Sequence, residues 1–315
     1  MIEKTRERIR EKPVPEASAG RHVVRLRHPG RWISAVIIIG LAIPVVNLFA
    51  TNPNIDWSIV ADNQFGPTIL AGIVETMELT IISMAIAIGL GIILAVMRLS
   101  HNPVLVRVSW LFVWFFRSTP VLVQLIFWYN FALLLPTLSL SIPFGPNLAS
   151  VQTNSVISGF TAAVLGLSLH YAAYMAEVVR AGISSVNPGQ REAASALGMS
   201  STLTMRRVVL PQAMRVIIPP TGNEFLSLLK TTSLVSVIGG GDLLTRAQEV
   251  YSHTFRVIEL LIVASIWYLV ITSVMSVGQY YIERYFGRGS AATVTRHRRW
   301  KLPHVLQPAK IRGHA

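Results

Sequence analysis

Long stretches of hydrophobic residues recur along this chain, with short polar segments between them. A helix rises about 1.5 Å per residue, so a run of about 20 residues crosses a hydrocarbon core of roughly 30 Å. Because backbone groups in lipid must be hydrogen-bonded within their own segment, each run is predicted to form a transmembrane helix. The six runs are residues 33–50, 68–97, 110–135, 156–179, 213–238 and 258–282.

Six spans predict an all-α integral membrane protein whose two termini lie on the same side. The run 33–50 is at the lower length limit for a span, so a cleaved signal peptide is an alternative interpretation. The charged segment ahead of it is too long for a signal peptide, and no clear A-x-A cleavage site follows. We therefore favour a retained helix at this position.

Composition agrees with a membrane protein. Of the 315 residues, 52% are hydrophobic and 14% are charged. A chain of this composition would expose more apolar surface to water than an ordinary soluble domain does. The absence of cysteine excludes disulfides, thiolate metal sites, iron–sulfur clusters and a cysteine nucleophile. No pair of histidines has the HExxH spacing, so neither a metal site nor a cofactor is predicted.

The net charge of +13 comes mostly from the two tails, residues 1–32 and 284–315, and from alternate connections between the apolar runs. Residues 51–66 and 136–154 contain no Lys or Arg, and the two arginines in 239–256 are accompanied by two acidic residues. The positive-inside rule therefore makes both termini cytoplasmic. Anionic lipids, rather than nucleic acid, are the predicted partners of the basic tails.

One segment between the runs, residues 187–211, is polar and rich in alanine and in helix-capping residues. Asn187 is a predicted N-cap, Pro188 suits the first helical position, and Gln190 can close a capping box. Gly198 suits a left-handed C-cap, and residues 200–202 offer N-caps for a second helix that runs up to a proline at position 211. These features predict a helical hairpin, which either docks on another protein or lies on the membrane surface.

The spacing inside this hairpin is more specific than its caps. It reads EAA, three residues, Gly, nine residues, Val208, one residue, Leu-Pro. This resembles the EAA loop of the inner-membrane permease subunits of ATP-binding-cassette (ABC) importers, with Val208 in place of the usual Ile. The matching residues are Glu192, Ala193, Ala194, Gly198, Leu210 and Pro211.

Three further segments resemble the polar amino-acid subfamily of these permeases. They are "FRSTPVLVQL" (116–125), "GLSLHYAAYMAEVVRAGISSV" (166–186) and "PPTGNEFLSLLKTTSLVSVI" (219–238). Ser118 stands where Gly is commoner, and Thr231 stands where Asp is commoner. The resemblance covers about 72–283 and implies a type I importer permease core, residues 68–283, with an extra helix at 33–50 and a coupling loop at 187–211.

The resemblance implies a permease subunit that carries polar amino acids or related small solutes, such as an opine, across a bacterial inner membrane. The chain has no GxxxxGK[ST] phosphate-binding loop, so ATP hydrolysis is assigned to a separate subunit and this chain is not predicted to be an enzyme. The implied partners are ABC ATPase subunits, a second permease subunit, identical or paralogous, and a periplasmic or extracellular solute-binding protein. The implied ATPase-coupling residues are Gly189, Gln190, Glu192, Ala193, Ala194, Gly198, Leu210 and Pro211.

Ionisable and polar residues inside the runs are candidates for the solute path or for contacts between helices, because a charge in a bilayer is costly. We expect Arg117 and Lys230 to pair with a carboxylate, with Glu224 as a partner, and we assign Glu75 and Glu177 to the membrane interface. A secondary transporter or channel that uses these carboxylates, and a membrane scaffold that transports nothing, are the alternatives. Pro120, Pro211, Pro219 and Pro220 are expected to interrupt the helix hydrogen-bond ladder, which suits either gates that bend or the ordinary proline kinks of membrane helices. The candidates are Glu78, Arg117, Gln124, Tyr174, Asn223, Glu224, Lys230 and Ser233.

Overall fold

The computed structural model describes residues 29–141 and 147–287, so the predicted basic tails lie almost wholly outside the described residues. The chain divides into two compact units at Ile55. In the first unit, α1 (Pro29–Ala50) confirms the helix predicted at 33–50. The segment Trp32–Ala50 of this helix has a mean hydropathy of 2.5 and no buried residue, which suits a lipid-facing span.

The second unit is built around two long helices, α3 (Pro67–Arg98) and α8 (Gly159–Ser184), which pack closely against each other. A Cβ atom at Gly91 would lie 2.6 Å from the Met175 Cβ, so glycine is what lets the two backbones approach. Fully buried side chains, among them Leu79 of α3, fill this contact. The core of the unit therefore lies along the α3–α8 seam.

The next span is bent, so the single helix predicted at 110–135 is wrong. Helices α4 (Pro103–Ser118) and α5 (Val121–Tyr129) meet at 100°. Pro120 has no N–H to donate to the Phe116 carbonyl four residues earlier, which breaks the hydrogen-bond ladder. The Gln124 Nε2 donates to that carbonyl instead, at 3.0 Å. Pro120 thus interrupts the helix as expected, and Gln124 stabilises the resulting sharp turn.

A small β-hairpin follows, within a fold that is otherwise helical as predicted. After α6 (Phe131–Leu134), β1 (Thr137–Ser141) pairs antiparallel with β2 (Asn147–Gln152), and α7 (Thr153–Val156) leads into α8. The letters TLSLS in β1 alternate with a period of two, which is the pattern of a strand. This signal is short and was not used in the prediction.

The C-terminal half contains α9 (Pro188–Ala196), α10 (Ser201–Thr204), a π-helical turn η2 (Met205–Val209), and α11 (Leu210–Thr231). A 3₁₀ segment η3 (Thr232–Ile238), α12 (Leu243–Thr254) and α13 (Val257–Phe286) complete it. Pro219 and Pro220 lie inside α11, which continues through both prolines as one helix. Proline inside a membrane helix is tolerated where neighbouring groups bond the freed carbonyls.

Two short outer elements are tied to the bundle by polar contacts. The Trp267 Nε1 of α13 donates to the Gln64 carbonyl at the end of α2 (Trp57–Gln64), at 2.7 Å. The Leu243 N–H at the start of α12 donates to the Thr76 hydroxyl of α3 at 2.9 Å. Asp242 is fully buried and caps α12 by accepting from the Leu244 N–H at 3.0 Å. Burial raises the pKa of the Asp242 carboxyl above its usual range. Both elements are therefore fixed parts of the fold.

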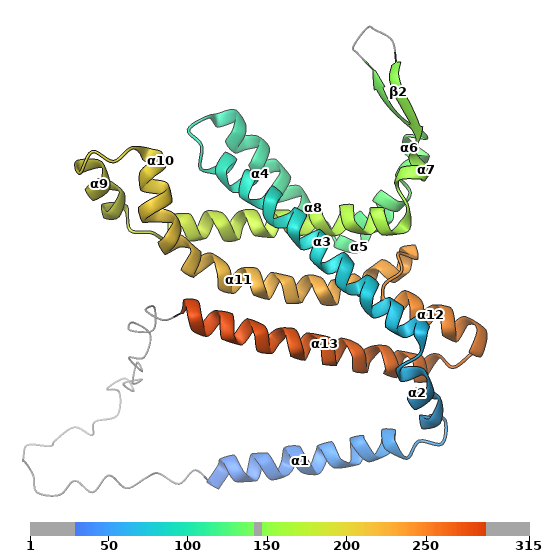
Figure 1. Ribbon diagram of the computed structural model, residues 1–315. Helices are drawn as coiled ribbons and strands as arrows, with labels where there is room; N and C mark the ends of the chain where they lie inside the picture. Colours follow the sequence, from blue (N-terminus) through green and yellow to red (C-terminus); the bar gives the residue numbers. More distant parts are fainter. Residues whose placement is uncertain (1–28, 142–146, 288–315) are drawn as a thin grey trace, which may run out of the picture. The chain divides into compact units, whose positions relative to one another are not determined.

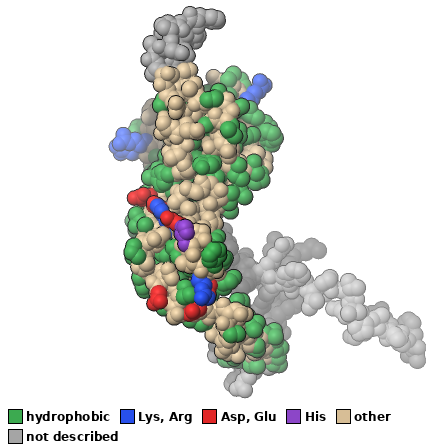
Figure 2. Space-filling view, turned by 90° about the vertical axis from the view of Figure 1, so that its right-hand side faces the viewer, with side chains coloured by type: hydrophobic (Ala, Val, Ile, Leu, Met, Phe, Trp, Pro, Cys, Tyr) green, Lys and Arg blue, Asp and Glu red, His purple; other side chains and the backbone are tan. Residues whose placement is uncertain are grey.

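Within the described residues, four helices are long and apolar enough to span a membrane, or five if the bent pair α4–α5 counts as one span. The predicted run 213–238 forms α11 and η3 and is not among them, so the count of six remains a prediction. Within the second unit, the C-terminal ends of α3, α8 and α13 lie at one end of the bundle, and α12 and the β-hairpin lie at the other (Figure 1). Figure 2 looks at this second end, where acidic, basic and histidine side chains gather across the middle and most of the remaining visible surface is hydrophobic or uncharged.

Candidate functional site

The predicted helical hairpin is present, and its first helix has the predicted caps. The Asn187 Oδ1 accepts from the Gly189 N–H at 2.8 Å, and α9 begins at Pro188. Gln190 contributes its backbone N–H, which donates to the Asn187 carbonyl at 3.0 Å, rather than a capping-box side chain. The start of α9 is therefore fixed by local interactions, as its sequence predicts.

The turn after α9 is a Schellman motif centred on Gly198. Gly198 has φ +74°, a left-handed conformation that disfavours other residues. Its N–H donates to the Ser195 carbonyl at 3.0 Å, and the Met199 N–H donates to the Ala194 carbonyl at 3.0 Å. These bonds satisfy the last carbonyls of α9 and fix the direction in which the chain leaves the helix. The predicted left-handed cap at Gly198 is confirmed.

The sequence predicted that the second helix runs only up to Pro211. In the structure the helix continues past this residue. Ser200 caps α10 through the Leu203 N–H at 3.4 Å, and the helix then widens into η2. The Leu210 N–H donates to the Met205 carbonyl, a spacing of five residues that makes room for Pro211 at the start of α11. The hairpin is thereby continuous with α11, so a force on one is transmitted to the other.

The hairpin presents apolar side chains to solvent at the end of the bundle. Leu197 is 82% exposed beside Gly198, and Glu192 and Ala193 are exposed on α9, whereas Ala194 is buried against the hairpin. The Arg191 guanidinium donates to the Ile183 carbonyl at 3.1 Å, which ties α9 to the end of α8. An exposed leucine on an otherwise polar element suits docking on another protein.

A polar cavity of about 350 Å³ lies between α4, α8 and the end of α3. This volume is within the range of small-molecule sites. Two tryptophans on α4 stack with ring centroids 6.1 Å apart beside it. The polar and aromatic side chains that line the cavity include Arg98, Trp110, Trp114, Arg117, Tyr174 and Glu177.

The charges of this cavity are unequally paired. Glu177 binds the Arg180 guanidinium at 2.8 Å and lies 3.4 Å from that of Arg98. Arg117 instead stands over the ring of Tyr174, 5.0 Å from its centroid. No ion pair joins Arg117 or Lys230 to a carboxylate within the part of the chain that the structure describes. The expected pairing is therefore absent, and the Arg117 charge faces the cavity.

Helix α11 brings further polar groups toward α8. The Tyr171 hydroxyl lies 2.9 Å from the Thr231 Oγ1 and 3.2 Å from the Ser227 Oγ. Glu224 is partly buried and lies three residues before Ser227, which puts it on the same side of α11. Helices α8 and α11 run antiparallel (Figure 1), so the contact of Tyr171 with Ser227 brings Tyr174 and Glu224, each about one turn further along, to a similar level.

The other sequence candidates are more dispersed. Gln124 is buried, and its amide nitrogen holds the α4–α5 bend and contacts the His170 Nδ1 at 3.2 Å. The Ser233 hydroxyl donates to the Lys230 carbonyl of its own chain segment at 2.8 Å. Glu78, Asn223 and Lys230 have exposed side chains. Among the eight candidates, the structure thus brings Arg117 and Tyr174 into direct contact.

Sequence reasoning missed the ion pairs of two glutamates. Glu177, assigned to the interface, contacts Arg98, and Glu75 contacts Arg246 at 2.6 Å. Each partner lies far along the chain on another helix, so no local pattern could have identified it. A signal did exist, because an unexplained carboxylate in an apolar run calls for a basic partner.

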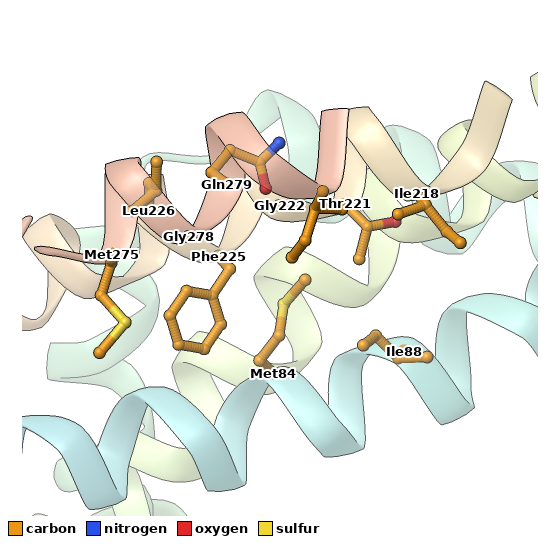
Figure 3. A pocket seen from close by; sticks show the side chains of 11 residues that line it. Met84, Ile88, Ile218, Thr221, Gly222, Phe225, Leu226, Met275, Gly278 and Gln279 are labelled. Atoms are coloured by element: carbon orange, nitrogen blue, oxygen red, sulfur yellow. The ribbon is translucent and has the colours of Figure 1, made fainter. Parts of the chain in front are cut away.

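A second cavity, of about 340 Å³, is lined mainly by apolar side chains of α3, α11 and α13. Phe225, Met84 and Met275 face one another across it (Figure 3). Gln279 lies at its edge, where its amide donates to the Pro219 carbonyl at 2.8 Å. A polar solute would lose hydrogen bonds to water here, so the cavity beside Arg117 is the better candidate for solute binding.

The chain is similar to several characterised transport proteins. It is 48% identical over 272 residues to the arginine transport system permease protein ArgU of Corynebacterium glutamicum, which covers 86% of this chain and 84% of the relative. It is 38% identical over 211 residues to the nopaline transport system permease protein NocM of Agrobacterium fabrum, or 67% and 84% of the two chains.

A solved structure, described as an amino acid ABC transporter with histidines, matches 73% of this chain and 99% of its own, with 34% identity and a TM-score of 0.62. A family model, the binding-protein-dependent transport system inner membrane component, matches residues 87–288. The resemblance first indicated by the spacing from Glu192 to Pro211 is thus confirmed over most of the chain. The chain belongs to the family of binding-protein-dependent transport system inner membrane components, and it is the membrane-spanning permease subunit of an ABC importer.

Proposed function

We propose that this permease carries amino acids with a cationic side chain across a bacterial inner membrane. The observation that supports a site for the solute carboxylate is the Arg117 guanidinium, which faces a polar cavity and lacks a carboxylate partner among the described ion pairs. The carboxylates of Glu224 and Glu78 support the cationic class. The names of two similar proteins, which mention arginine and histidines, favour the same solute class.

The geometry suits a zwitterion with an additional positive charge. Arg117 offers a guanidinium to the solute carboxylate, in a bidentate pair that fits planar carboxylates. The Tyr174 ring offers a π-face, and Glu224 offers a carboxylate from α11 at a similar level, so both can receive cationic groups. The exposed Glu78 on α3 adds negative potential along a path for a cation. Asn223, Lys230 and Ser233 are kept as path candidates, and Gln124 is assigned to the bend.

The hairpin of α9 and α10 is proposed as the docking site of a separate ATPase subunit, with its coupling residues between Gly189 and Pro211. Leu197 would enter an apolar groove of that subunit, since it is 82% exposed. Because η2 joins the hairpin to α11, movement of the docked ATPase would shift the helix that carries Glu224. The permease itself would not hydrolyse ATP.

The complete importer is proposed to contain two ATPases, two permease subunits, identical or paralogous, and a solute-binding protein on the outer side. The permease core is assigned to residues 68–283, with the helix at 33–50 as an addition and the basic tails against anionic lipids. A nopaline-like solute is the second candidate, because one relative is a nopaline permease.

The test is uptake by proteoliposomes that contain the permease, its ATPase and its binding protein. Radiolabelled arginine, histidine, glutamine, glutamate and nopaline are offered in turn, and arginine is expected to be taken up fastest. Replacing Arg117 by Gln is expected to raise the KM for arginine about tenfold or more, because one charge-assisted contact contributes about 1.5–3 kcal/mol.

Arg107→Gln is the matched control. Arg107 is also exposed on α4, but it does not line the polar cavity. The KM of this variant for arginine is therefore expected to equal that of the unmodified permease. Equal KM values for the Arg117 and Arg107 variants would refute the solute site. Preferential uptake of glutamate would refute the cationic solute class.

A further inference from the structure

The β1–β2 hairpin is firmly attached to the end of the helical bundle. At its base, the Thr153 N–H donates to the Pro136 carbonyl at 3.0 Å, and the Thr153 hydroxyl donates to the Leu135 carbonyl. Thr153 is fully buried. Beyond their mutual pairing, the strands make their main contacts with α7, the next helix in the chain. The direction of the hairpin is thus set at its base, while most of its length projects from the bundle.

The hairpin has one apolar and one polar face. Opposite residues in an antiparallel pair share a face, and successive residues alternate between faces. Leu138 pairs with Val151, and Leu140 lies two residues further along the same face. On the other face, Ser139 pairs with Ser150. The side chain of Val151 is 45% exposed, and that of Leu138 is partly exposed.

An isolated two-stranded hairpin is at best marginally stable in water, so its apolar face needs a covering surface. Continuity with the lipid-facing surface indicates what covers it. Leu133, Leu134 and Leu135, which follow the bent span directly, are 84%, 65% and 46% exposed. Residues 136–154 contain no charged side chain, so entry into the bilayer interface carries no charge-desolvation cost.

The orientation of the hairpin agrees with a position on the membrane surface. Figure 1 shows it turned across the direction of α8 and α11, at the end of α8 opposite to α9. Because α8 is a candidate membrane span, an element that turns aside at its end runs along the bilayer surface. The unpaired strand edges cannot enter hydrocarbon, where their N–H and C=O groups would lack partners. The interface, which is apolar below and hydrated above, satisfies both requirements.

We propose that β1–β2 is a membrane-binding element that lies flat in the bilayer interface. Leu138 and Val151 contact the acyl chains, while Ser139 and Ser150 face water. The ligand of this surface is the lipid bilayer, not a soluble protein. In this position the hairpin fixes the depth of the bent span α4–α5, whose residues Arg117 and Gln124 lie close to the bend.

Site-directed spin labelling tests this proposal, because the chain has no cysteine and each introduced one is a unique label site. The full-length permease is labelled at Leu138→Cys or Val151→Cys on the apolar face, and at Ser139→Cys or Ser150→Cys on the polar face. It is reconstituted in vesicles of phosphatidylethanolamine and phosphatidylglycerol. Collision rates are measured with oxygen, which partitions into lipid, and with a water-soluble nickel chelate.

The ratio of oxygen to nickel collisions is expected to be several-fold higher for the two apolar-face labels than for the two polar-face labels. Equal ratios on both faces, with high nickel access, would show that the hairpin stands in water and would overturn the proposal. Low access of the apolar-face labels to both reagents would also overturn it, because protein would then cover that face.

A second pair of variants tests the cause of the burial. In the Val151→Cys background, Leu138→Asp with Leu140→Asp is expected to lower the label's ratio to the polar-face value, because the charges cannot enter lipid. Thr137→Asp with Ser139→Asp adds the same charge on the polar face and is expected to leave the ratio unchanged. Identical effects of both pairs would contradict the lipid contact.

Discussion

At the residue scale, Gly198 decides the shape of the α9–α10 hairpin, the proposed docking site of the ATPase. Its φ of +74° costs an L-residue about 1 kcal/mol, although asparagine tolerates this region better than alanine does. No atom lies within 4 Å of a Cβ built at this position, so the effect of substitution is purely conformational. The prediction that follows therefore does not involve a steric clash.

We predict that Gly198→Ala reduces ATP-driven uptake and that Gly198→Asn retains most of it. Gly198→Pro combined with Glu192→Lys is expected to abolish uptake, because it destroys the turn and alters the charge of the docking surface. Uptake and ATP hydrolysis are measured in the same proteoliposomes. Equal uptake by the Ala and Asn variants would argue against a role for the left-handed turn.

Gly222 lies where α13 crosses α11. A Cβ there would come within 1.5 Å of the Gln279 Oε1, so Gln279 would have to move and give up its bond to the Pro219 carbonyl. We predict that Gly222→Ala and Gln279→Ala each destabilise the protein by about 1–2 kcal/mol. Because both remove the same contact, the double variant should cost less than the sum.

Thermal unfolding in detergent measures this cycle. Gly278→Ala is the matched control. Gly278 lies on α13 beside Gln279, and nothing lies within 4 Å of a Cβ built at that position. Its Tm is expected to stay constant or rise slightly, because alanine favours the helix. Strict additivity of the Gly222 and Gln279 effects would contradict the shared contact.

At the element scale, α12 is held to α3 by a two-pronged ion pair. The Arg246 Nη2 lies 2.6 Å from the Glu75 Oε1, and its Nε lies 3.0 Å from the Glu75 Oε2. Hydrogen bonds to Glu75, and then to Glu249, raise the pKa of Arg246, so the guanidinium remains charged wherever the protein is folded. The pair is partly exposed, which limits its contribution to stability.

We predict that Arg246→Lys weakens the docking of α12 by about 0.5–1 kcal/mol, because an ammonium cannot reproduce the fork. Hydrogen exchange of the α12 backbone amides reports the change. Arg256→Lys is the control, because its single contact to Glu259 is 3.7 Å long and needs only a point charge. A similar increase in exchange for both variants would refute the importance of the fork.

How much of each element could be predicted depends on the range of the forces that form it. The turn at Gly198 and the start of α9 depend on neighbours within a few residues, so the sequence predicts them well. The bend at Pro120 was expected as a break, but its angle depends on Gln124. The pairing of Glu177 with Arg98 needs the folded bundle, so no local pattern contains it.

At the scale of the whole molecule, the arrangement of charge agrees with the positive-inside prediction. The connections that follow α3 and α8, and the end of α13, share one end of the second unit, and the strands β1 and β2, which carry no charged residue, lie at the other (Figure 1). The family supports a membrane-spanning fold, but it does not fix the number of spans. The sides on which the tails lie therefore remain predictions that labelling can decide.

We predict six spans with both tails cytoplasmic, because their basic residues resist translocation. Single cysteines are introduced in intact cells at Ser18, His101 and Ser290, expected inside, and at Ser155 and Thr254, expected outside. A membrane-impermeant maleimide should label the outer pair at once and the inner three only after the membrane is opened, which also controls for reactivity. If Ser18 and Ser290 react on opposite sides, the number of spans is odd. In that case one of two segments does not cross the bilayer. It is either α1 or the α11–η3 segment, and the latter is more polar than the other spans.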